Sequence, residues 1–574
     1  MSAIVILLIA IAVFVIAYVT YGSWLAKEWG VDPSRPTPAH TMEDGIDYMP
    51  AKSPVLMGHH FASIAGAGPI NGPIQAAFFG WVPVLLWIII GGIFFGAVQD
   101  FSSILVSVRH DGRSLGEVIE ANIGHRCKVL FTVFAWLVLI LVIAAFGDIV
   151  ASSFASDGTA ATLANGSVAT ASILFIPLAM VFGFLVYRRN MPLLVSTIIG
   201  VIVLAACVAI GLAFPITLPK TFWFVFVFIY IAIASVTPVW ILLQPRDYLS
   251  SFLLYFMIIA AIVGIFGSNP TIDPESLPAF SGFVVSGKSM FPVLFITIAC
   301  GAISGFHSLI GSGTTSKQLD NEKDAKMIGY GGMLIECVLA VISLIAISSY
   351  VNGIEGANAF NVIYGGTEGV NKVSPTVVFS TGIASMFQKI GFGDKVVDAT
   401  KTVIALAVSA FCLTSLDTGT RLGRFMFQEL FASKNNNANP VQKSLSNMYV
   451  ATAVTVVFGG VLCLSGYTNI WPLFGACNQL VAVPAFLAVA VWLAKSGRNN
   501  KMLYFPMVFM LAATLTSLVI SFKDNIVKFS GGTASFAKEG LQCVIIVPIF
   551  VLAIMLVIEG GKVLIACEKN RKKN

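Results

Sequence analysis

The sequence predicts an all-α polytopic membrane protein of about 15 transmembrane helices, with two broken helices at the centre of an inverted repeat. Three observations carry this prediction. Of the 574 residues, 57% are hydrophobic and only 11% are charged, whereas soluble domains carry roughly 25% charged residues. Apolar runs long enough to cross a bilayer recur from one end of the chain to the other. A glycine-containing motif occurs twice, in runs expected to cross the membrane in opposite directions.

The expected spans are read from the apolar runs. The first run lacks a basic start and a small-residue cleavage site, so it counts as a span and not as a signal peptide. A periplasmic N-terminus and a cytoplasmic C-terminus place most of the 34 Lys and Arg residues on the cytoplasmic side, as the positive-inside rule requires. In this arrangement the short segment 244–248 is a cytoplasmic connection. The spans are expected near 3–26, 55–78, 81–105, 129–152, 168–187, 192–214, 221–243, 249–267, 290–312, 327–350, 402–420, 447–466, 470–494, 502–522 and 541–561.

The stretch 57–80 is apolar enough to enter a bilayer, but its sequence does not suit an unbroken helix. Pro69 and Pro73 each remove a backbone donor and clash with the preceding turn. A break at membrane depth persists only where it faces protein or a wet cavity. We therefore interpret this stretch as the centre of a substrate site, with a kinked packing helix as the alternative. Three glycines allow close approach to its backbone: Gly66, Gly68 and Gly72.

The inverted repeat is predicted from the motif F-x-S-[IL]-x-G-x-G, which occurs at 61–68 and at 306–313. The two copies lie seven expected spans apart, so they are antiparallel. Interrupted helices in matching positions of inverted repeats mark the binding site of many transporters. Two weaker similarities are also separated by seven expected spans. Asp148 and Asp417 each lie near the end of a span, and Lys220 and Lys501 each lie at the start of one.

Longer motifs point to a family. They are GHHFASIAGAGPINGP from Gly58, G-x₄-G-x₃-D-F from Gly91, SVRHDGRSLGEVI from Ser107, LTSLDTGTRLGRFMFQEL from Leu413 and WPLFGACNQLVA from Trp471. Together they resemble the carbon starvation protein A (CstA) family of bacterial inner-membrane proteins, over most of the chain. The resemblance implies secondary uptake of peptides or pyruvate, coupled to protons, in cells short of carbon. It also implies kinship with the APC superfamily, whose LeuT-like core is two inverted five-helix repeats.

The resemblance implies a division of the chain around that core. Spans two to six and nine to thirteen would form the two repeats, and the other spans would be additions, with a strict seven-plus-seven repeat as the alternative. The expected parts are 1–54 (an N-terminal helix and cytoplasmic loop), 55–214 (first repeat), 215–289 (additional helices), 290–494 (second repeat) and 495–574 (additional helices and a basic tail).

The expected solute site lies at the two breaks. A half-helix that begins near Gly68 presents free N–H groups and the positive end of its dipole, which favour a carboxylate. Peptides and pyruvate both carry one, so both substrates stay open. Asn71 and Gln75, one turn apart beyond the break, either bind solute or only satisfy freed backbone groups. The expected substrate-binding residues are Gly66, Gly68, Asn71, Gln75, Phe306, Ser308, Gly311, Asn478 and Gln479.

Ionisable groups inside spans are costly, and they are functional candidates by default. The histidines inside spans are expected to converge at the breaks, where they would serve proton or substrate binding, a structural role, or a transition-metal site. We expect Glu336, at the middle of its span, to carry a proton. Asp100 with Arg109, and Asp417 with Arg421, are expected to form local pairs. The expected proton- or ion-coupling residues are His59, His60, His307, Glu336, Thr414, Ser415 and Asp417.

Other function classes are weighed against proton-coupled transport. Thr414 and Ser415 resemble the hydroxyl pair that binds sodium in APC relatives, so a sodium-coupled, amino-acid-like transporter is one alternative, and a non-pumping sensor or channel is another. No nucleophile elbow, H-E-x-x-H or P-loop occurs, so neither an enzyme nor a cofactor is expected. The net charge of +6 is not concentrated in any loop. The expected partners are a small solute, a coupling ion (H⁺ or Na⁺) and the lipid bilayer, without nucleic acid.

Overall fold

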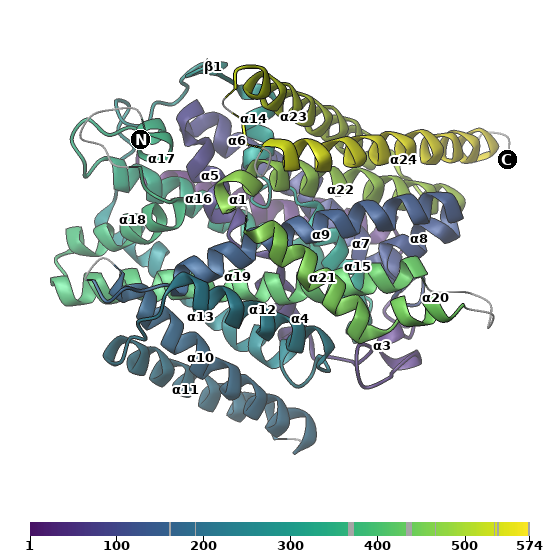
Figure 1. Ribbon diagram of the computed structural model, residues 1–574, viewed down its shortest axis with the longest axis horizontal. Helices are drawn as coiled ribbons and strands as arrows, with labels where there is room; N and C mark the ends of the chain where they lie inside the picture. Colours follow the sequence, from purple (N-terminus) through teal and green to yellow (C-terminus); the bar gives the residue numbers. More distant parts are fainter. Residues whose placement is uncertain are drawn as a thin grey trace.

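The computed structural model describes residues 1–159, 162–189, 191–365, 372–431, 439–464, 466–532, 534–535 and 539–571. The described chain is almost wholly helical, and most of its long helices run roughly parallel, horizontally in Figure 1. Its described residues form one small sheet, the antiparallel hairpin of β1 (Val284–Val285) and β2 (Lys288–Ser289). The expected all-α class is therefore confirmed.

Eleven helices, some of them continued by an adjoining helical turn, are long and apolar enough to cross a membrane, which agrees with a multi-pass membrane protein. Their apolar side chains face outward along much of the surface, for example Leu194 (73% exposed) and Val461 on a shorter helix (65% exposed). The eleven are α1–α2 (Ala3–Glu28), α6–α7 (Trp81–Val108), α9 (His125–Phe154), α10 (Leu163–Gly183, continued to Val186), α11 (Leu193–Ala213), α13 (Leu243–Ser268), α16 (Gly332–Val351, preceded by a turn from Lys326), α19 (Asp394–Phe431), α22 (Tyr467–Lys495), α23 (Tyr504–Ser530) and α24 (Leu541–Arg571).

The four other expected spans are shorter or interrupted. Two are the apolar helices α12 (Lys220–Val236) and α21 (Met448–Cys463). The third is the pair α4 (Ser53–Ile64) and α5 (Gly68–Ala76), and the fourth is the pair α14 (Met290–Thr297) and α15 (Gly305–Gly313). The number of 15 membrane crossings stays a prediction. Short helices in the connections are α3 (Pro38–Thr41), α8 (Leu115–Asn122), α17 (Ala359–Tyr364), α18 (Pro375–Ile390) and α20 (Pro440–Leu445).

The two breaks fall at different points of the repeated motif. In the first copy the chain leaves the helix after Ile64, so Gly66 lies within the break. In the second copy the break is 298–304 and precedes the motif, because α15 is continuous from Gly305 to Gly313. The expectation that Gly311 marks a break is therefore wrong. Its missing side chain serves packing instead, since a Cβ there would lie 3.1 Å from Ile104 of α7.

The predicted cytoplasmic connection 244–248 is also wrong. These residues form the beginning of α13, and Arg246 and Asp247 are fully buried there. Arg246 and Asp247 form an ion pair, with 2.6 Å between Nη2 and Oδ1. Because the two charges are paired, both side chains can be buried at the start of the helix.

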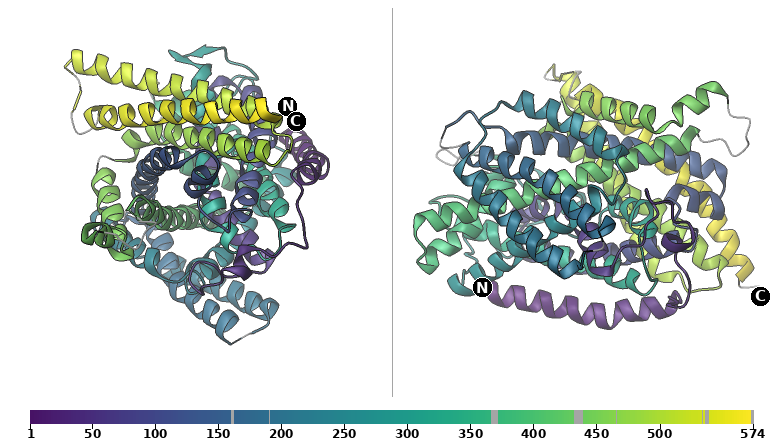
Figure 2. Two further views of the ribbon diagram at one scale, coloured as in Figure 1. Left: turned by 90° about the vertical axis from the view of Figure 1, so that its right-hand side faces the viewer. Right: turned by 90° about the horizontal axis from the view of Figure 1, so that it is seen from below.

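A central pair of helices organises the packing. α9 lies along α19, and α21 and α22 also pack on α9. The half-helix α4 packs on α13, whereas α15 packs on α7 and α22. α10 and α11 form a hairpin at the lower edge of Figure 1, and α23 and α24 lie along the upper edge. Figure 2 shows α1 on the outer surface at the N-terminal end of the chain.

Candidate transport site

The first break is held by hydroxyl groups from α19. The last carbonyls of a helix have no partner within the helix. Ser415 donates its Oγ hydrogen to the Ser63 carbonyl (3.0 Å), and Ser63 Oγ lies 3.3 Å from Thr418 Oγ1. Gly66 permits this approach, because a Cβ there would lie 2.9 Å from Ser415 Oγ. Thr414 Oγ1 is buried and has no partner within the described chain.

The second break is held by two side-chain amides from α22. Asn478 Oδ1 accepts a hydrogen bond from the Phe306 backbone N–H (2.7 Å), which caps the start of α15. Gln479 donates to the Phe295 carbonyl at 2.9 Å. Both residues were expected to bind solute, and both are engaged with backbone groups freed by the break. Their role as solute ligands stays a prediction.

The two breaks touch each other. A Cβ on Gly68 would lie 2.4 Å from Cys300 Sγ, and a Cβ on Gly72 would lie 2.7 Å from the Thr297 carbonyl. Glycine is therefore required at these positions for α5 to lie against α14 and the second break. Gly96 of the α6–α7 span serves the same purpose, since its Cβ would lie 2.4 Å from the carbonyl of Ala302.

A cleft of about 390 Å³ reaches both breaks at Gly68 and Cys300. Among the described residues, one cation and one anion line it, Lys288 of the hairpin and Asp524 of α23. Lys288 Nζ lies 4.2 Å from the centre of the Tyr364 ring, and burial lowers the pKa of this lysine. The lining also contains Gln75, Ser289, Trp471, Phe474 and Ser517. The cleft thus offers a mixed polar and aromatic surface with both signs of charge.

The expected solute-binding residues divide between separate places. Gly68 and Gln75 line the cleft. Asn71 lines a second cavity of about 530 Å³ between α5, α9, α18 and α19, and accepts a hydrogen bond from Thr376 Oγ1 (3.3 Å). Phe306 and Ser308 are buried on α15 and do not line the cleft, and the Ser308 hydroxyl donates to the Gly305 carbonyl.

A buried polar network joins α4, α13, α19 and α12. His59 Nδ1 lies 2.7 Å from Asp247 Oδ2, and Arg246 donates to Asp247 Oδ1 through Nε at 3.0 Å and Nη2 at 2.6 Å. Arg246 Nη1 also bonds to Asp417 Oδ2. The Tyr230 hydroxyl donates to the same Asp417 oxygen at 2.9 Å. One arginine thus bridges two carboxylates that come from different helices.

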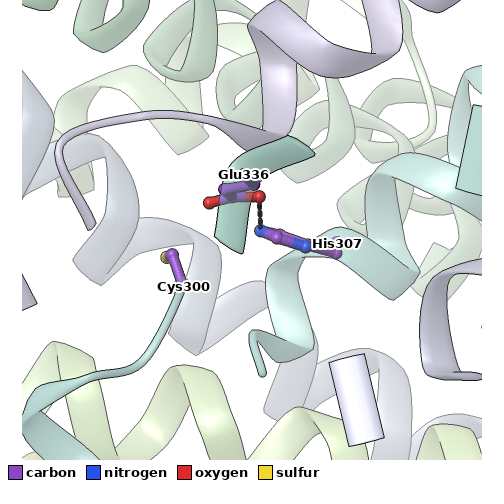
Figure 3. Close-up of side chains that lie close together, drawn as sticks. All are labelled: Cys300, His307 and Glu336. Carbon is purple, nitrogen blue, oxygen red and sulfur yellow. Dashed lines mark ion pairs between the residues drawn. The ribbon is translucent and has the colours of Figure 1, made fainter. Parts of the chain in front are cut away.

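A second buried cluster lies beside the second break, with members on α15, α7 and α16. Figure 3 shows three residues of this region, Cys300, His307 and Glu336. His307 Nδ1 lies 3.0 Å from Asp100 Oδ2, and His307 Nε2 points toward Glu336 Oε2 at 3.6 Å. Cys300 approaches the same space from the break, and one ligand atom each from Cys300, His307 and Glu336 lie within 4.8 Å of one another. These three are the described residues that can hold a metal ion as a group.

The three histidines are only partly brought together. His60 Nδ1 lies 2.8 Å from Thr315 Oγ1, and His60 is within electrostatic range of His59 and His307. Each ring nevertheless has its own hydrogen-bond partner. A metal site built from the three histidines is therefore not what the described residues form.

Both expected local ion pairs are wrong. Asp100 bonds to His307, and Arg109 bonds to Glu322 at 2.7 Å. Asp417 bonds to Arg246, whereas Arg421 reaches Asp47 at 2.9 Å. In each case a partner distant in sequence replaces the expected nearby one. Sequence reasoning also missed Cys300, Arg246 and Asp247. The only signal for the last two was a charged pair that directly precedes an apolar run.

Sequence comparison places these features in a family. Residues 2–517 match the family described as "Carbon starvation protein CstA". The "Peptide transporter CstA" of Escherichia coli K12 is 34% identical over 569 residues, covering 88% of this chain and 79% of that protein. Its Bacillus subtilis namesake is 34% identical over 519 residues, covering 84% of each chain. The "Pyruvate/proton symporter BtsT" of E. coli K12 is 31% identical over 605 residues, covering 90% of this chain and 81% of that protein.

A solved structure of the Eremococcus coleocola manganese transporter, in complex with an aromatic bis-isothiourea compound, aligns with 92% of this chain and 99% of that chain. The TM-score is 0.48 and the sequence identity is 13%. The sequence matches cover nearly the whole chain, including both breaks and both buried clusters. The chain belongs to the carbon starvation protein CstA family.

Proposed function

We propose that this protein imports short peptides or pyruvate across the bacterial inner membrane by alternating access. A proton gradient would drive the uptake. The observation that carries the proposal is the cleft that ends at two touching helix breaks. Broken helices give a small solute backbone groups and dipole ends that an intact helix keeps occupied. The relatives named as a peptide transporter and as a pyruvate/proton symporter support the same solutes.

The charges in the cleft suit these solutes. A peptide is a zwitterion, and Lys288 and Asp524 offer one charge for each of its ends. Pyruvate is an anion, and it would rely on Lys288 and on the start of α5. The proposal therefore includes both substrates. Substitutions of Lys288 and Asp524 would test how the cleft selects between them.

We place proton coupling first at His59. A proton on its ring turns the hydrogen bond to the Asp247 carboxylate into an ion pair, which adds the attraction between two opposite charges in a buried site. This bond ties α4 to α13, and Arg246 extends the tie to α19. The neighbouring Arg421 is already paired with Asp47. Protonation would thus hold the half-helix α4 in place, and proton loss would release it. Coupling roles for His60, His307, Glu336 and Asp417 stay predictions.

The movement would use a symmetric core. α4 packs on α13 as α14 packs on α22, α9 packs on α12 as α19 packs on α21, and α7 packs on α15 as α16 packs on α5. These matched contacts favour two inverted units of five. The first would be α4/α5, α6/α7, α9, α12 and α13, and the second α14/α15, α16, α19, α21 and α22. This division differs from the expected first repeat at 55–214, because it leaves the α10–α11 hairpin outside the core (Figure 1).

Sodium coupling is a second candidate, favoured by one observation. The hydroxyl of Ser415 reaches the Ser63 carbonyl at the first break, and Thr414 Oγ1 lies buried beside it without a partner. Hydroxyl and carbonyl oxygens are the ligands that hard cations prefer. The two candidates differ in which ion gradient drives uptake.

The test is uptake into proteoliposomes that contain the purified full-length protein. Radiolabelled pyruvate and a radiolabelled dipeptide are offered separately, under an imposed inward proton gradient, an inward sodium gradient or neither. Accumulation driven by the proton gradient, and abolished by a protonophore, is expected. Accumulation driven only by sodium would favour the second candidate. Uptake of neither solute above protein-free liposomes under any gradient would overturn the proposal.

A further inference from the structure

The second cavity, which Asn71 lines, is large enough for a small solute of its own. Its volume is about 530 Å³, and sites for small molecules commonly measure about 300–1,000 Å³. The half-helix α5 borders this cavity through Asn71 and borders the cleft through Gly68 and Gln75. No described residue lines both spaces. The cavity and the cleft are therefore two neighbouring spaces that meet at the same half-helix.

Hydroxyl and amide groups line the second cavity from α5, α9, α10, α18 and α19. Ser153 Oγ of α9 lies 2.7 Å from Ser409 Oγ of α19, and Thr376 of α18 donates to Asn71 Oδ1 at 3.3 Å. These bonds join the walls but do not exhaust the side chains, because each hydroxyl oxygen can accept two hydrogen bonds. Polar groups inside a membrane protein are costly unless protein, water or a solute bonds to them. The lining thus suits a solute that carries hydrogen-bond donors and acceptors.

One ion pair supplies the charge of the second cavity. Among the described residues that line it, Asp148 of α9 and Lys220 of α12 are the charged ones, with 2.5 Å between Oδ1 and Nζ. The Asp148 side chain is 11% exposed and that of Lys220 is 48% exposed. Lys220 also lines an outer space of about 430 Å³, to which the α9–α10 and α11–α12 connections contribute. Ion pairs that are partly exposed contribute little net stability, so a solute can open this one at small cost.

We propose that the second cavity binds a short peptide as a zwitterion, with its ammonium group on Asp148 and its carboxylate on Lys220. The inference rests on the proposed function, because it assigns a second site to one of the two solutes. An extended peptide adds about 3.3–3.6 Å per residue, which is longer than the gap of the closed ion pair. Lys220 therefore swings aside on its flexible stem, and the peptide lies between the two charges. Its backbone groups then face the hydroxyls and amides of the cavity wall.

The same pair of charges disfavours a lone anion such as pyruvate. A bound anion would compete with Asp148 for Lys220, and it would bring a second carboxylate close to that of Asp148. Like charges at short distance repel each other. A zwitterion avoids this conflict because it brings an ammonium group for Asp148. The second cavity is therefore selective for peptides, whereas the cleft suits both solutes.

The test is equilibrium dialysis of radiolabelled dialanine against the purified full-length protein in detergent. The cavity variant, Asp148→Asn with Lys220→Met, and the cleft variant, Lys288→Met with Asp524→Asn, should each retain about half of the wild-type binding at saturation, since each keeps one of two separate sites. N-acetyl-dialanine lacks the ammonium group, so it should bind to the cleft variant about tenfold more weakly than dialanine. Labelled pyruvate should not bind to the cleft variant, because the second cavity disfavours an anion.

The matched control is Asp398→Asn with Lys395→Met. It removes one charge of each sign from α19, as the cavity variant does from α9 and α12, but neither residue lines the cavity or the cleft. It should bind as much dialanine as the wild type. A cavity variant that also binds as much as the wild type would overturn the site, and so would a cleft variant or a wild type that binds none.

Folding and transport are separated from this readout. If one of the two variants does not fold, as judged by size-exclusion chromatography, the other variant decides. Dialanine binding that divides between the two variants, without any uptake into proteoliposomes, would contradict the transport proposal alone. Uptake of dialanine together with unchanged binding in the cavity variant would contradict the second site alone.

Discussion

His59 of the first broken helix and Asp247 of α13 meet in the protein interior, with 2.7 Å between Nδ1 and Oδ2. Both side chains are fully buried. The bond connects α4, the half-helix that ends at the first break, with a helix anchored through Arg246 to α19. It therefore ties the first broken helix to two long helices of the protein.

Replacing this histidine should separate transport from its driving force. His59→Gln keeps a donor for Asp247 but cannot take a proton. Proton-driven accumulation in proteoliposomes should fall by about tenfold or more. A tenfold change corresponds to about 1.4 kcal/mol. Solute exchange without a gradient should fall less. His125→Gln is the control, because His125 is an exposed histidine paired only with Glu120. Equal loss in accumulation and exchange would argue against a coupling role for His59.

The arginine of this network should matter more for stability than either carboxylate. Removing one partner of a buried ion pair costs about 3–5 kcal/mol, because the other charge stays buried and unpaired. Arg246→Met leaves Asp247 and Asp417 without their arginine, each with one remaining partner, His59 and Tyr230 respectively, whereas Asp417→Asn leaves Arg246 paired with Asp247. The thermal unfolding temperature in detergent should therefore fall further for Arg246→Met. A larger fall for Asp417→Asn would show that Asp247 does not hold the arginine.

The fold and the first break could be predicted from the sequence because both depend on local chemistry. Apolar runs set the helices, and Pro69 and Gly68 set the start of α5. The partners of buried charges could not be predicted in the same way. Asp100, Asp417 and Arg421 all have plausible neighbours in the sequence, yet the first two pair with residues on other helices and Arg421 pairs with Asp47 of the connection between α3 and α4. Such choices depend on which helices pack together, and periodicity carries no information about that.

The second break was predicted at the wrong residues for a related reason. The motif at 306–313 repeats the glycines of the first copy, but its glycines serve contact with α7 and α19. The break itself, at 298–304, contains only one glycine and no proline. It is held open by Asn478 and Gln479 of α22. A break stabilised by a distant helix leaves little trace in its own sequence.

A methyl group added to α5 where it faces the backbone of α14 should destabilise the contact between the two breaks. Gly72→Ala would place a Cβ 2.7 Å from the Thr297 carbonyl, and overpacking of this kind typically costs about 1–3 kcal/mol. We expect a lower unfolding temperature and impaired uptake. Gly561→Ala is the matched control, since nothing lies within 4 Å of a Cβ there. Normal stability of Gly72→Ala would mean that α5 and α14 are not in firm contact.

The same contact offers a rescue at Gly68. A Cβ on Gly68 meets the Cys300 side chain, not backbone, at 2.4 Å. Gly68→Ala should therefore impair stability, and the double variant Gly68→Ala with Cys300→Gly should recover part of the loss, because it removes both the Cβ and the Sγ of Cys300, each of which would lie 2.4 Å from the added Cβ. The unfolding temperatures of the two single variants and the double variant measure this coupling. Additive effects would contradict the contact.

Stability should depend on pH through His110, in the turn that follows α7. His110 Nδ1 lies 2.7 Å from the Val106 carbonyl, Asn122 Nδ2 lies 3.0 Å from its Nε2, and burial lowers the pKa of His110 below its ordinary value of 6.5. The unfolded chain therefore binds this proton more readily than the folded protein. The stability contribution is present above pH 6.5 and is lost as the pH falls below it. The unfolding temperature of wild-type protein should fall more between pH 7.5 and 5.5 than that of His110→Gln, and an equal fall would contradict the assignment.

The charged residues that line the cleft, Lys288 and Asp524, should determine whether the protein prefers an anionic or a zwitterionic solute. Lys288→Met removes the cation that the described part of the chain places at the cleft, while keeping a side chain of similar length. The KM for pyruvate should rise by several-fold or more, since a charge pair at about 4 Å is worth between about 1 and 4 kcal/mol in partly exposed surroundings. The KM for a dipeptide should rise less, because its amino group keeps Asp524. Asp524→Asn should act in the opposite sense, raising the KM for the dipeptide while leaving or lowering that for pyruvate. Lys323→Met, in a connection outside the cleft, controls for a change in net charge. Equal effects of Lys288→Met on both solutes would place solute entry elsewhere, for instance at the cavity that Asn71 lines.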